Sequence, residues 1–264
     1  MIIKKSPAEI DSMAAAGNIL VRCMDLIASK IRPGVTTLEL DAAAEKFIRS
    51  QGATPAFKGY RGFPGSICAS PNEMVVHGIP GRFKLSRGDI LSVDIGVVKD
   101  GWVADAARTF PVGEVSAVAA KLLEVTEGSL FAAVEQCRPG NRLGDVSHAV
   151  QEYVESRGFS IVRSLVGHGV GRDMHEEPQV PNYGPAGKGT PLTEGMVLAV
   201  EPMVNAGRHM VRMGDDGWAI YSQDGSLAAH FEFTIAITAS GPRILTPWHH
   251  PERATSADSA PAAA

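Results

Sequence analysis

Residues 90–105 read ILSVDIGVVKDGWVAD, two apolar runs joined by Asp100-Gly101, a dipeptide typical of a two-residue β-turn. With that turn between antiparallel strands, Gly96 faces Asp105, and alternation along the strand puts Asp94 on the same sheet face. The two carboxylates are then diagonal neighbours with Cα atoms about 7 to 8 Å apart. We expect Gly96, which has no side chain, to leave the space between them open. The stretch predicts a hairpin with two acids on one face.

The apolar surroundings of these acids are unusual, because burying an unpaired carboxylate costs several kcal/mol. Two further segments repeat the feature: residues 196–201 read MVLAVE and end at Glu201, and residues 231–237 read FEFTIAI around Glu232. The alternative for the hairpin is a pair of ordinary solvated acids at a sheet edge, which the neighbours of Asp94 disfavour. Four carboxylates in strand-like segments indicate that something cationic holds them.

A histidine completes the set, since residues 167–171 read GHGVG and their glycines place His168 at a strand end or bend. Four carboxylates and one imidazole, without a thiolate, are too negative for one divalent ion. Two ions fit better, and paired metals activate water in hydrolytic enzymes. Mn, Fe, Co and Zn are all compatible with these ligands.

An internal repeat runs through the chain. Arg-Pro-Gly occurs at 32–34 and again at 138–140, an offset of 106. Each follows an expected helix, over 6–31 and from 116, and precedes a second helix that ends near Gly52 or Gly158. Such a pattern predicts two similar halves, roughly 6–110 and 116–240, related by a pseudo-twofold axis within a single catalytic domain over 1–250.

Composition narrows the class of protein. The chain has 264 residues, 44% of them hydrophobic, and a net charge of -4, which argues against DNA or RNA as the main partner. Its three cysteines are scattered and suggest no disulfide, which is typical of a reducing compartment. Without a secretion signal or membrane-length apolar segment, we expect a cytoplasmic protein with no membrane contact. Residues 251–264 are mostly Ala, Ser and Pro and are expected to form a disordered tail.

The five candidate ligands, with His77 in NEMVVHGIP (72–80) and His175 in HEEP (175–178), resemble the type I methionine aminopeptidases over nearly all of Ser6 to Ile244. This resemblance implies an α+β protein with the pita-bread fold, in which an antiparallel sheet cradles two metals and the duplicated helices lie outside. It also implies a monomeric hydrolase that removes the initiator methionine from nascent proteins with a small second residue.

The resemblance further implies roles for the site residues. Asp105 and Glu232 would bridge two divalent metal ions, Asp94 would chelate one of them, and His168 and Glu201 would bind the other. Glu201 would also accept a proton from the attacking water. The resemblance places two catalytic histidines beside the metals, in contact with the substrate: His77 and His175. Hydrogen bonds of this kind to a developing oxyanion are commonly worth about 3 to 4 kcal/mol.

The methionine pocket expected from the resemblance is apolar, aromatic and sulfur-containing, and its members are Tyr60, Phe63, Cys68, Met174, Trp218 and Phe57, with His77 and His175 at its edge. Three residues depart from the family pattern. Met174 occupies a place that often holds phenylalanine, Phe233 a place where histidine is common, and Phe57 that of a smaller residue. These departures concern pocket shape and the surroundings of the metals, and they remove no ligand.

Other readings of the sequence are an Xaa-Pro aminopeptidase or prolidase of the same fold and a metal-free binding module. The first usually has an extra N-terminal domain, and the second usually loses ligands. A serine nucleophile is disfavoured because no Gly-x-Ser-x-Gly segment occurs. A weaker hypothesis places Arg208 and Arg212 on an exposed loop that makes a transient contact with the ribosome.

Overall fold

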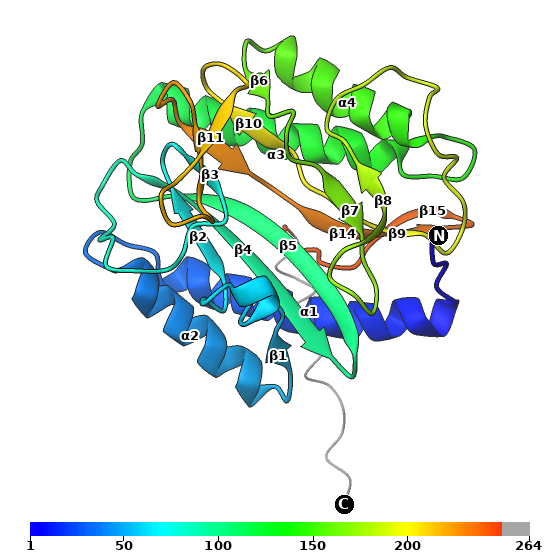
Figure 1. Ribbon diagram of the computed structural model, residues 1–264, viewed down its shortest axis with the longest axis horizontal. Coiled ribbons are helices and arrows are strands. Elements are labelled where there is room, and N and C mark those ends of the chain that lie inside the picture. The colour runs from blue at the N-terminus through cyan, green and yellow to red at the C-terminus, as the bar shows by residue number, and fades with distance from the viewer. Residues whose placement is uncertain (250–264) are drawn as a thin grey trace, which may run out of the picture.

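The computed structural model describes residues 1–249, in which two pairs of helices lie against antiparallel strands (Figure 1). The expected tail over 251–264 lies outside the described residues. The predicted helices are confirmed, and a short 3-10 turn is added to them. Their bounds are α1 Pro7–Lys30, α2 Thr37–Ser50, η1 Tyr60–Gly62, α3 Ala117–Gln136 and α4 Leu143–Glu155.

Local sequence explains where α1 begins. Ser6 and Glu9 form a capping box in which each side chain accepts a hydrogen bond from the other residue's backbone, and Pro7 occupies the first turn. One face of α1 is then buried at three- and four-residue steps, which fixes the helix against β4 (Ile90–Lys99) and β5 (Trp102–Pro111). The same type of box at Thr36 and Glu39 starts α2.

The spacing of the repeat recurs in the structure. Helix α2 begins at Thr37 and α4 at Leu143, an offset of 106. The turns before them also match, since Gly34 has φ +93° and Gly140 has φ +96°, backbone conformations that favour glycine. The interpretation of the two halves as copies of one unit stays a prediction.

The strands pair antiparallel throughout the described residues. Their ladders form four sheets rather than one: β1-β4-β2 with β5 beside β4, β15-β14-β9-β7-β8, β13-β10-β6, and β11-β12-β3. The bounds are β1 Thr54–Pro55, β2 Cys68–Pro71, β3 Met74–Val76, β4 Ile90–Lys99, β5 Trp102–Pro111, β6 Ser160–Ile161, β7 Gly167–Gly169, β8 Glu176–Val180, β9 Val197–Val200, β10 Met203–Asn205, β11 Val211–Met213, β12 Ile220–Ser222, β13 Ala228–His230, β14 Phe233–Thr238 and β15 Gly241–Ile244.

The hairpin β4–β5 has the predicted register, in which Lys99 faces Trp102 and Gly96 faces Asp105. The expectation that Gly96 leaves open space is wrong. A Cβ at this position would lie 2.8 Å from both the Ala56 Cβ and the Phe57 Cε1. The chain after β1 therefore packs over the hairpin and fills the room that the glycine leaves.

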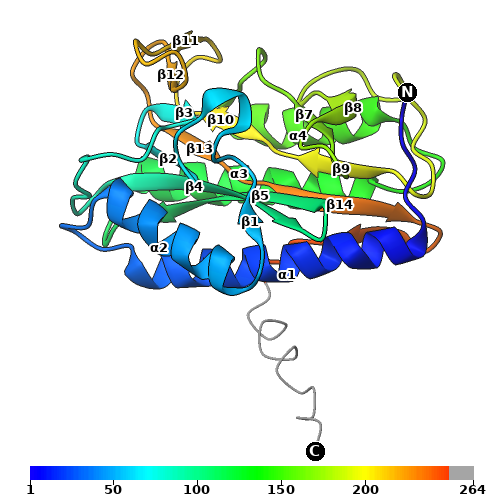
Figure 2. The ribbon, with the colours of Figure 1, turned by 60° about the horizontal axis from the view of Figure 1, so that its bottom comes forward.

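The two halves meet where β5 lies beside β14. The Asp105 backbone N–H donates to Thr234 Oγ1 at 3.0 Å, and the same hydroxyl donates to the Asp105 carbonyl at 2.7 Å. The Glu232 N–H also donates to the Ala107 carbonyl at 2.9 Å. In Figure 2 helices α1 and α2 lie below the strands, α3 and α4 lie behind them, and the loops around β3, β11 and β12 rise at the upper left. A hydrophobic core between helices and strands holds these layers together.

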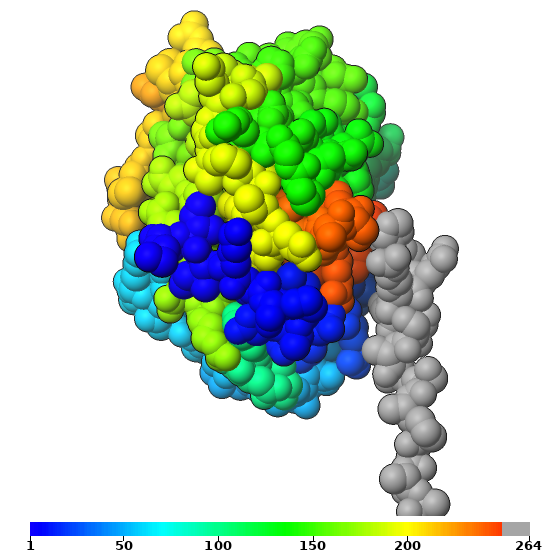
Figure 3. Space-filling view, turned by 90° about the vertical axis from the view of Figure 1, so that its right-hand side faces the viewer, coloured from blue at the N-terminus to red at the C-terminus, as the bar shows by residue number. Residues whose placement is uncertain are grey.

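The N-terminal segment before α1 lies against the second half of the molecule (Figure 3). The Lys5 N–H donates to the Gly195 carbonyl at 2.7 Å, and the Lys5 ammonium forms an ion pair with Glu176. Both side chains are buried, with 2% and 5% exposure. Within residues 1–249, none of the helices has the length and apolar character needed to cross a bilayer.

Candidate metal centre

All five predicted ligands line one cavity, although they come from five different strands or strand ends. Asp94 lies within β4 and Asp105 within β5, while His168 is the middle residue of β7. Glu201 follows β9 and Glu232 precedes β14, and these strands pair through Val200 and Phe233, so the two glutamates lie at the same end of the pair. The strands thus bring acids from both halves together at the centre of the molecule.

Side-chain distances show how tightly the group is gathered. His168 Nε2 lies 3.6 Å from Glu201 Oε1 and 3.8 Å from Asp105 Oδ2. Asp105, His168 and Glu232 each offer one ligand atom, and these atoms lie within 4.8 Å of one another. All three residues are buried, with exposures of 3%, 8% and 1% respectively. Such spacing around a shared point suits a bound cation.

Several carboxylate oxygens in the centre are buried without a hydrogen bond from any described residue. These atoms are Asp94 Oδ1, Asp105 Oδ1 and Glu232 Oε1. A buried acceptor left in this way costs about 1–3 kcal/mol, more when it is charged. The donor set is oxygen-rich with one imidazole and no thiolate, which suits Mn, Fe, Co or Zn. The residues therefore fit a divalent metal, which would complete the coordination of these oxygens.

The electrostatics of the acids lead to the same conclusion. Burial raises the pKa of Asp94 to about 7 and that of Glu201 to about 7. Burial, reinforced by the neighbouring acids, raises the pKa of Asp105 and of Glu232 well above the usual range. Burial also lowers the pKa of His168, which favours the neutral, ligating imidazole. A divalent cation would reverse the shifts of the carboxyl groups by stabilising their charged forms.

The cavity beside the acids has a volume of about 320 Å³. Its walls include every residue expected in the methionine pocket, together with both histidines at its edge: Phe57, Tyr60, Phe63, Cys68, His77, Met174, His175 and Trp218. The rings of Phe63 and Trp218 meet edge to face at 5.1 Å. An apolar, aromatic and sulfur-lined space thus opens directly onto the acidic cluster, an arrangement that suits an apolar residue attached to a reacting group.

His77 and His175, the two predicted catalytic histidines, differ in their surroundings: His77 has an unusual backbone conformation, and the ring of His175 contacts Tyr60 and His168. His77 has φ +60°, an uncommon conformation for a residue with a side chain and one that recurs at functional sites. His175 Nδ1 lies 2.9 Å from the Tyr60 hydroxyl, and its ring centre lies 4.2 Å from that of His168. One ring nitrogen of His175 is therefore engaged by Tyr60 beside the acidic cluster.

The three residues that depart from the family pattern are Phe233, Met174 and Phe57, and the structure shows where each side chain lies. Phe233 is fully buried, and its ring packs 4.7 Å from that of Trp248, away from the cavity walls. Trp248 in turn donates its indole N–H to the Glu232 carbonyl at 2.9 Å. Met174 and Phe57 both line the cavity, so they do shape the pocket.

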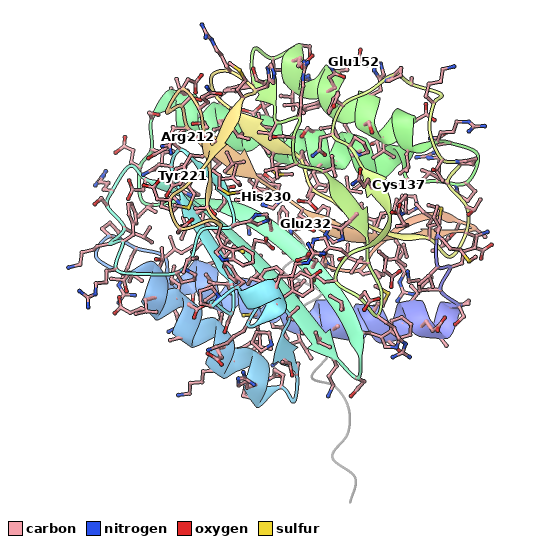
Figure 4. The ribbon with its side chains drawn as sticks, viewed as in Figure 1. Cys137, Glu152, Arg212, Tyr221, His230 and Glu232 are labelled. Carbon is pink, nitrogen blue, oxygen red and sulfur yellow. The ribbon has the colours of Figure 1, made fainter. Side chains whose placement is uncertain are left out.

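Sequence reasoning missed His230, the last residue of β13. Its side chain is 2% exposed, and its Nε2 lies 3.5 Å from Glu201 Oε2. Figure 4 shows it near the centre of the molecule, close to Glu232. The available signal was its position two residues before Glu232, since alternate residues of an extended chain point to the same side.

Comparison with known proteins supports a single family. The model of metallopeptidase family M24 matches residues 11–252. The chain is 53% identical to the methionine aminopeptidase of Clostridium perfringens over 246 residues, which are 93% of this chain and 99% of the relative. It is 54% identical to methionine aminopeptidase 1 of Bacillus subtilis, again over 93% of this chain and 99% of the relative.

Solved structures show the same arrangement. The crystal structure of methionine aminopeptidase from Rickettsia prowazekii superposes with a TM-score of 0.92 at 41% identity and covers 93% of this chain and 100% of its own. A prolidase from Pyrococcus furiosus has a TM-score of 0.76 at 24% identity, over 92% of this chain and 65% of its own, a likeness in fold alone. The α+β pita-bread fold expected from the resemblance is confirmed.

Proposed function

The chain belongs to metallopeptidase family M24, and from this premise we propose that it is a hydrolase that removes the N-terminal methionine from peptides and nascent proteins. High identity to methionine aminopeptidases over more than nine tenths of the chain supports this activity. The observation that carries the proposal is the convergence of five ligand residues, with three unpartnered carboxylate oxygens, on a cavity with apolar walls.

The proposed cofactors are two divalent metal ions, with Mn, Fe, Co and Zn as candidates. Asp105 and Glu232 would bridge the two ions, as the resemblance implies; both are buried, and each offers a ligand atom within 4.8 Å of the other and of one from His168. Asp94 would bind one ion, and His168 and Glu201 the other. Such ions lower the pKa of a water molecule and polarise a carbonyl group, which supplies a nucleophile at neutral pH.

Residues of the chain would carry out the proton transfer and donate the hydrogen bonds that the reaction needs. Glu201 has one oxygen 3.6 Å from His168 and would accept the proton of the attacking water, then return it to the leaving amine. His77 and His175 border the cavity beside the acids and would donate hydrogen bonds to the developing oxyanion and the amide nitrogen. The contact between Tyr60 and His175 Nδ1 leaves Nε2 of that ring for the substrate.

The proposed substrate class follows from the walls of the cavity. Aromatic rings and the sulfur atoms of Cys68 and Met174 suit a thioether side chain, because sulfur against an aromatic edge contributes about 0.3 to 1.5 kcal/mol. Burial and the surrounding acids raise the pKa of the Cys68 thiol, so it lines the pocket in neutral form. Limited room beyond the scissile bond would restrict the second residue to small side chains.

The activity is tested with three dipeptide substrates, Met-Ala, Met-Leu and Ala-Pro, on metal-stripped protein reconstituted with one divalent ion at a time. Hydrolysis of Met-Ala far above the other two, and only with metal present, is expected. Preferred hydrolysis of Ala-Pro would instead favour a prolidase-like enzyme. Metal-independent hydrolysis would contradict the proposed chemistry.

Substitution of either proposed bridging ligand tests the metal assignment more specifically than the substrate assay does. Asp105→Ala or Glu232→Ala should reduce the kcat for Met-Ala by at least 10³-fold, roughly the scale of losing a main catalytic element, while the circular dichroism spectrum is retained. The matched control is Glu152→Ala on the outer helix α4, whose side chain is 72% exposed (Figure 4). Normal turnover by either bridging variant would show that the ligand assignment is wrong.

The remaining proposals concern the setting of the enzyme. We propose one catalytic domain over 1–250 that acts as a monomer in the cytoplasm, and the free, buried cysteines suit a reducing compartment. Arg208 precedes β11, whereas Arg212 lies within that strand and not on a loop as expected. Both residues are exposed, which supports transient ribosome contact. Replacing both arginines with glutamate should then reduce co-sedimentation with ribosomes at low salt, and unchanged co-sedimentation would count against the contact.

A further inference from the structure

His230 is an unexplained polar residue deep in the molecule. Its side chain is 2% exposed. Among the described residues, its Nε2 neither accepts nor donates a hydrogen bond. Buried polar atoms without partners are rare in folded proteins, and each calls for a physical reason. One polar atom that faces this nitrogen is Glu201 Oε2, at 3.5 Å, and the Asp94 carboxylate also acts on the imidazole electrostatically.

The backbone of His230 is held by hydrogen bonds at both its N–H and its carbonyl group. Its N–H donates to Thr109 Oγ1 at 2.9 Å, and the same hydroxyl donates back to the His230 carbonyl at 2.9 Å. His230 also faces Met203 in the pairing of β13 with β10. These contacts fix the backbone of His230, from which the imidazole reaches Glu201.

The two oxygens of Glu201 face different histidines. Oε1 lies 3.6 Å from His168 Nε2, on the side of the proposed metals, whereas Oε2 lies 3.5 Å from His230 Nε2. Glu201 lines the cavity and His230 does not, so His230 stands behind the carboxylate as seen from the cavity. The backbone carbonyl of Glu201 is held separately by Asn182 Nδ2 at 3.0 Å.

We propose that His230 is a positioning residue for Glu201: its Nε2–H donates to Oε2 and so directs Oε1 toward the metal. Carboxylates that bind metals are commonly oriented in this way by a partner outside the coordination sphere, and loss of that partner weakens metal binding by about 10- to 100-fold. A neutral imidazole suffices, because one ring nitrogen of neutral histidine always carries a hydrogen. The inference rests on the proposed function, since it assigns Glu201 to a metal.

The test compares His230→Leu, which removes the donor, with His230→Gln, whose amide can donate from a similar place. Mn²⁺ is titrated calorimetrically into each metal-stripped protein at constant pH. We expect His230→Leu to bind one of two equivalents about 10- to 100-fold more weakly, and His230→Gln to remain within about threefold of the wild type, well short of that loss. For Met-Ala, kcat should fall in His230→Leu while KM changes little. His148→Leu, on the exposed face of α4, controls for the exchange of histidine for leucine.

Stability separates positioning from packing. Urea unfolding of the metal-stripped His230→Leu protein should show stability close to that of the wild type, because leucine fills the buried site and only the contact with Glu201 is lost. Should leucine prevent folding, His230→Phe, which keeps a flat ring without a donor, carries the same expectation for metal binding.

Two results would overturn the inference. One is wild-type Mn²⁺ affinity in every folded variant that lacks the donor. The other is complete loss of one metal equivalent in His230→Gln as well, which would make His230 a ligand itself. Failure of the proposed function is distinct, because the wild-type protein would then bind no metal in the same titration.

Discussion

Asp94 and Asp105 show how a buried acid pair prepares a site for a cation. They lie on one face of the β4–β5 hairpin, two positions apart in register, and burial raises the pKa of both. Asp94 further raises the pKa of Asp105. Protons and a metal ion bound by these acids would compete for the same oxygens, so metal binding would release protons.

This competition predicts a pH dependence of stability. The pKa of Asp94 rises from 3.8 in a free chain to about 7 in the fold, so the folded state holds its proton more tightly. Its contribution to the free energy of unfolding is complete below about pH 4 and is lost as pH rises toward 7, by at most about 1.4 kcal/mol for each pH unit. Metal-stripped wild type should therefore lose stability relative to Asp94→Asn over this range.

Urea denaturation of both proteins from pH 4 to 8 measures the difference. Comparison with the variant is necessary because burial lowers the pKa of His230 to about 4. This shift makes the free energy of unfolding rise with pH, opposite to the effect of Asp94. His230 is present in both proteins, so its contribution largely cancels. A wild type that gains stability relative to Asp94→Asn as pH rises would contradict the account.

At the scale of single residues, the sequence pointed to the acids that gather at the cavity but not to the residues that contact them. Asp94, Glu201 and Glu232 were recognisable because apolar neighbours made a charge there costly. His230 has no acidic charge among apolar neighbours, and its one sequence signal was its position two residues before Glu232. Its importance depends on the approach of Glu201 from another sheet, which is a long-range contact.

At the scale of elements, the β4–β5 hairpin positions the pocket as well as the acids. Gly96 lies opposite Asp105, and the segment after β1 packs on the glycine. Phe57 from this segment lines the cavity. The absence of a side chain at residue 96 therefore places an aromatic ring at the pocket wall.

Gly96→Ala should disturb this contact. The added Cβ would lie 2.8 Å from atoms of Ala56 and Phe57, closer than side chains pack, so we expect a loss of about 1–3 kcal/mol in stability. Displacement of Phe57 should also raise the KM for Met-Ala more than it lowers kcat. Thermal unfolding and steady-state kinetics measure the two effects.

Gly81→Ala is the matched control for this exchange. A Cβ at residue 81 would meet nothing nearer than 3.8 Å, and its backbone conformation is open to alanine. The control should resemble the wild type in both measurements. If Gly96→Ala did so too, the packing of Phe57 on the hairpin would not be what shapes the pocket.

Elements with local signals were predictable, and those without were not. Capping residues such as Ser6 and Thr36 mark where helices begin, and Asp100-Gly101 fixes the register of a hairpin. The short strands β1 and β6, of two residues each, carry no periodicity and exist only through distant partners. The division into four sheets also depends on distant partners and could not be predicted from the sequence. The same holds for the packing of Ala56 and Phe57 into the space beside Gly96.

At the scale of the whole molecule, the two halves are tied together at several points. Besides the contacts of β5 with β14, the N-terminal segment reaches the second half through Lys5 and Glu176. Glu176 follows His175 and also accepts the Arg172 N–H at 3.0 Å. The start of the chain is thereby coupled to the loop that borders the active site.

Lys5→Met should be strongly destabilising, because it leaves the Glu176 carboxylate buried without its partner. Removing one member of a buried ion pair typically costs about 3–5 kcal/mol. Lys4→Met, at the exposed neighbouring position, should change stability by less than about 0.5 kcal/mol. Chemical denaturation with metal bound measures both, and equal stability of the two variants would show that the ion pair does not hold the segment.

We propose that acids from both halves bind paired metals beside the methionine pocket. Anomalous X-ray scattering from crystals of the protein loaded with Mn²⁺ tests it directly. We expect two peaks about 3.5 to 4 Å apart, enclosed by Asp94, Asp105, His168, Glu201 and Glu232. Peaks elsewhere on the molecule, or none at saturating metal, would contradict it.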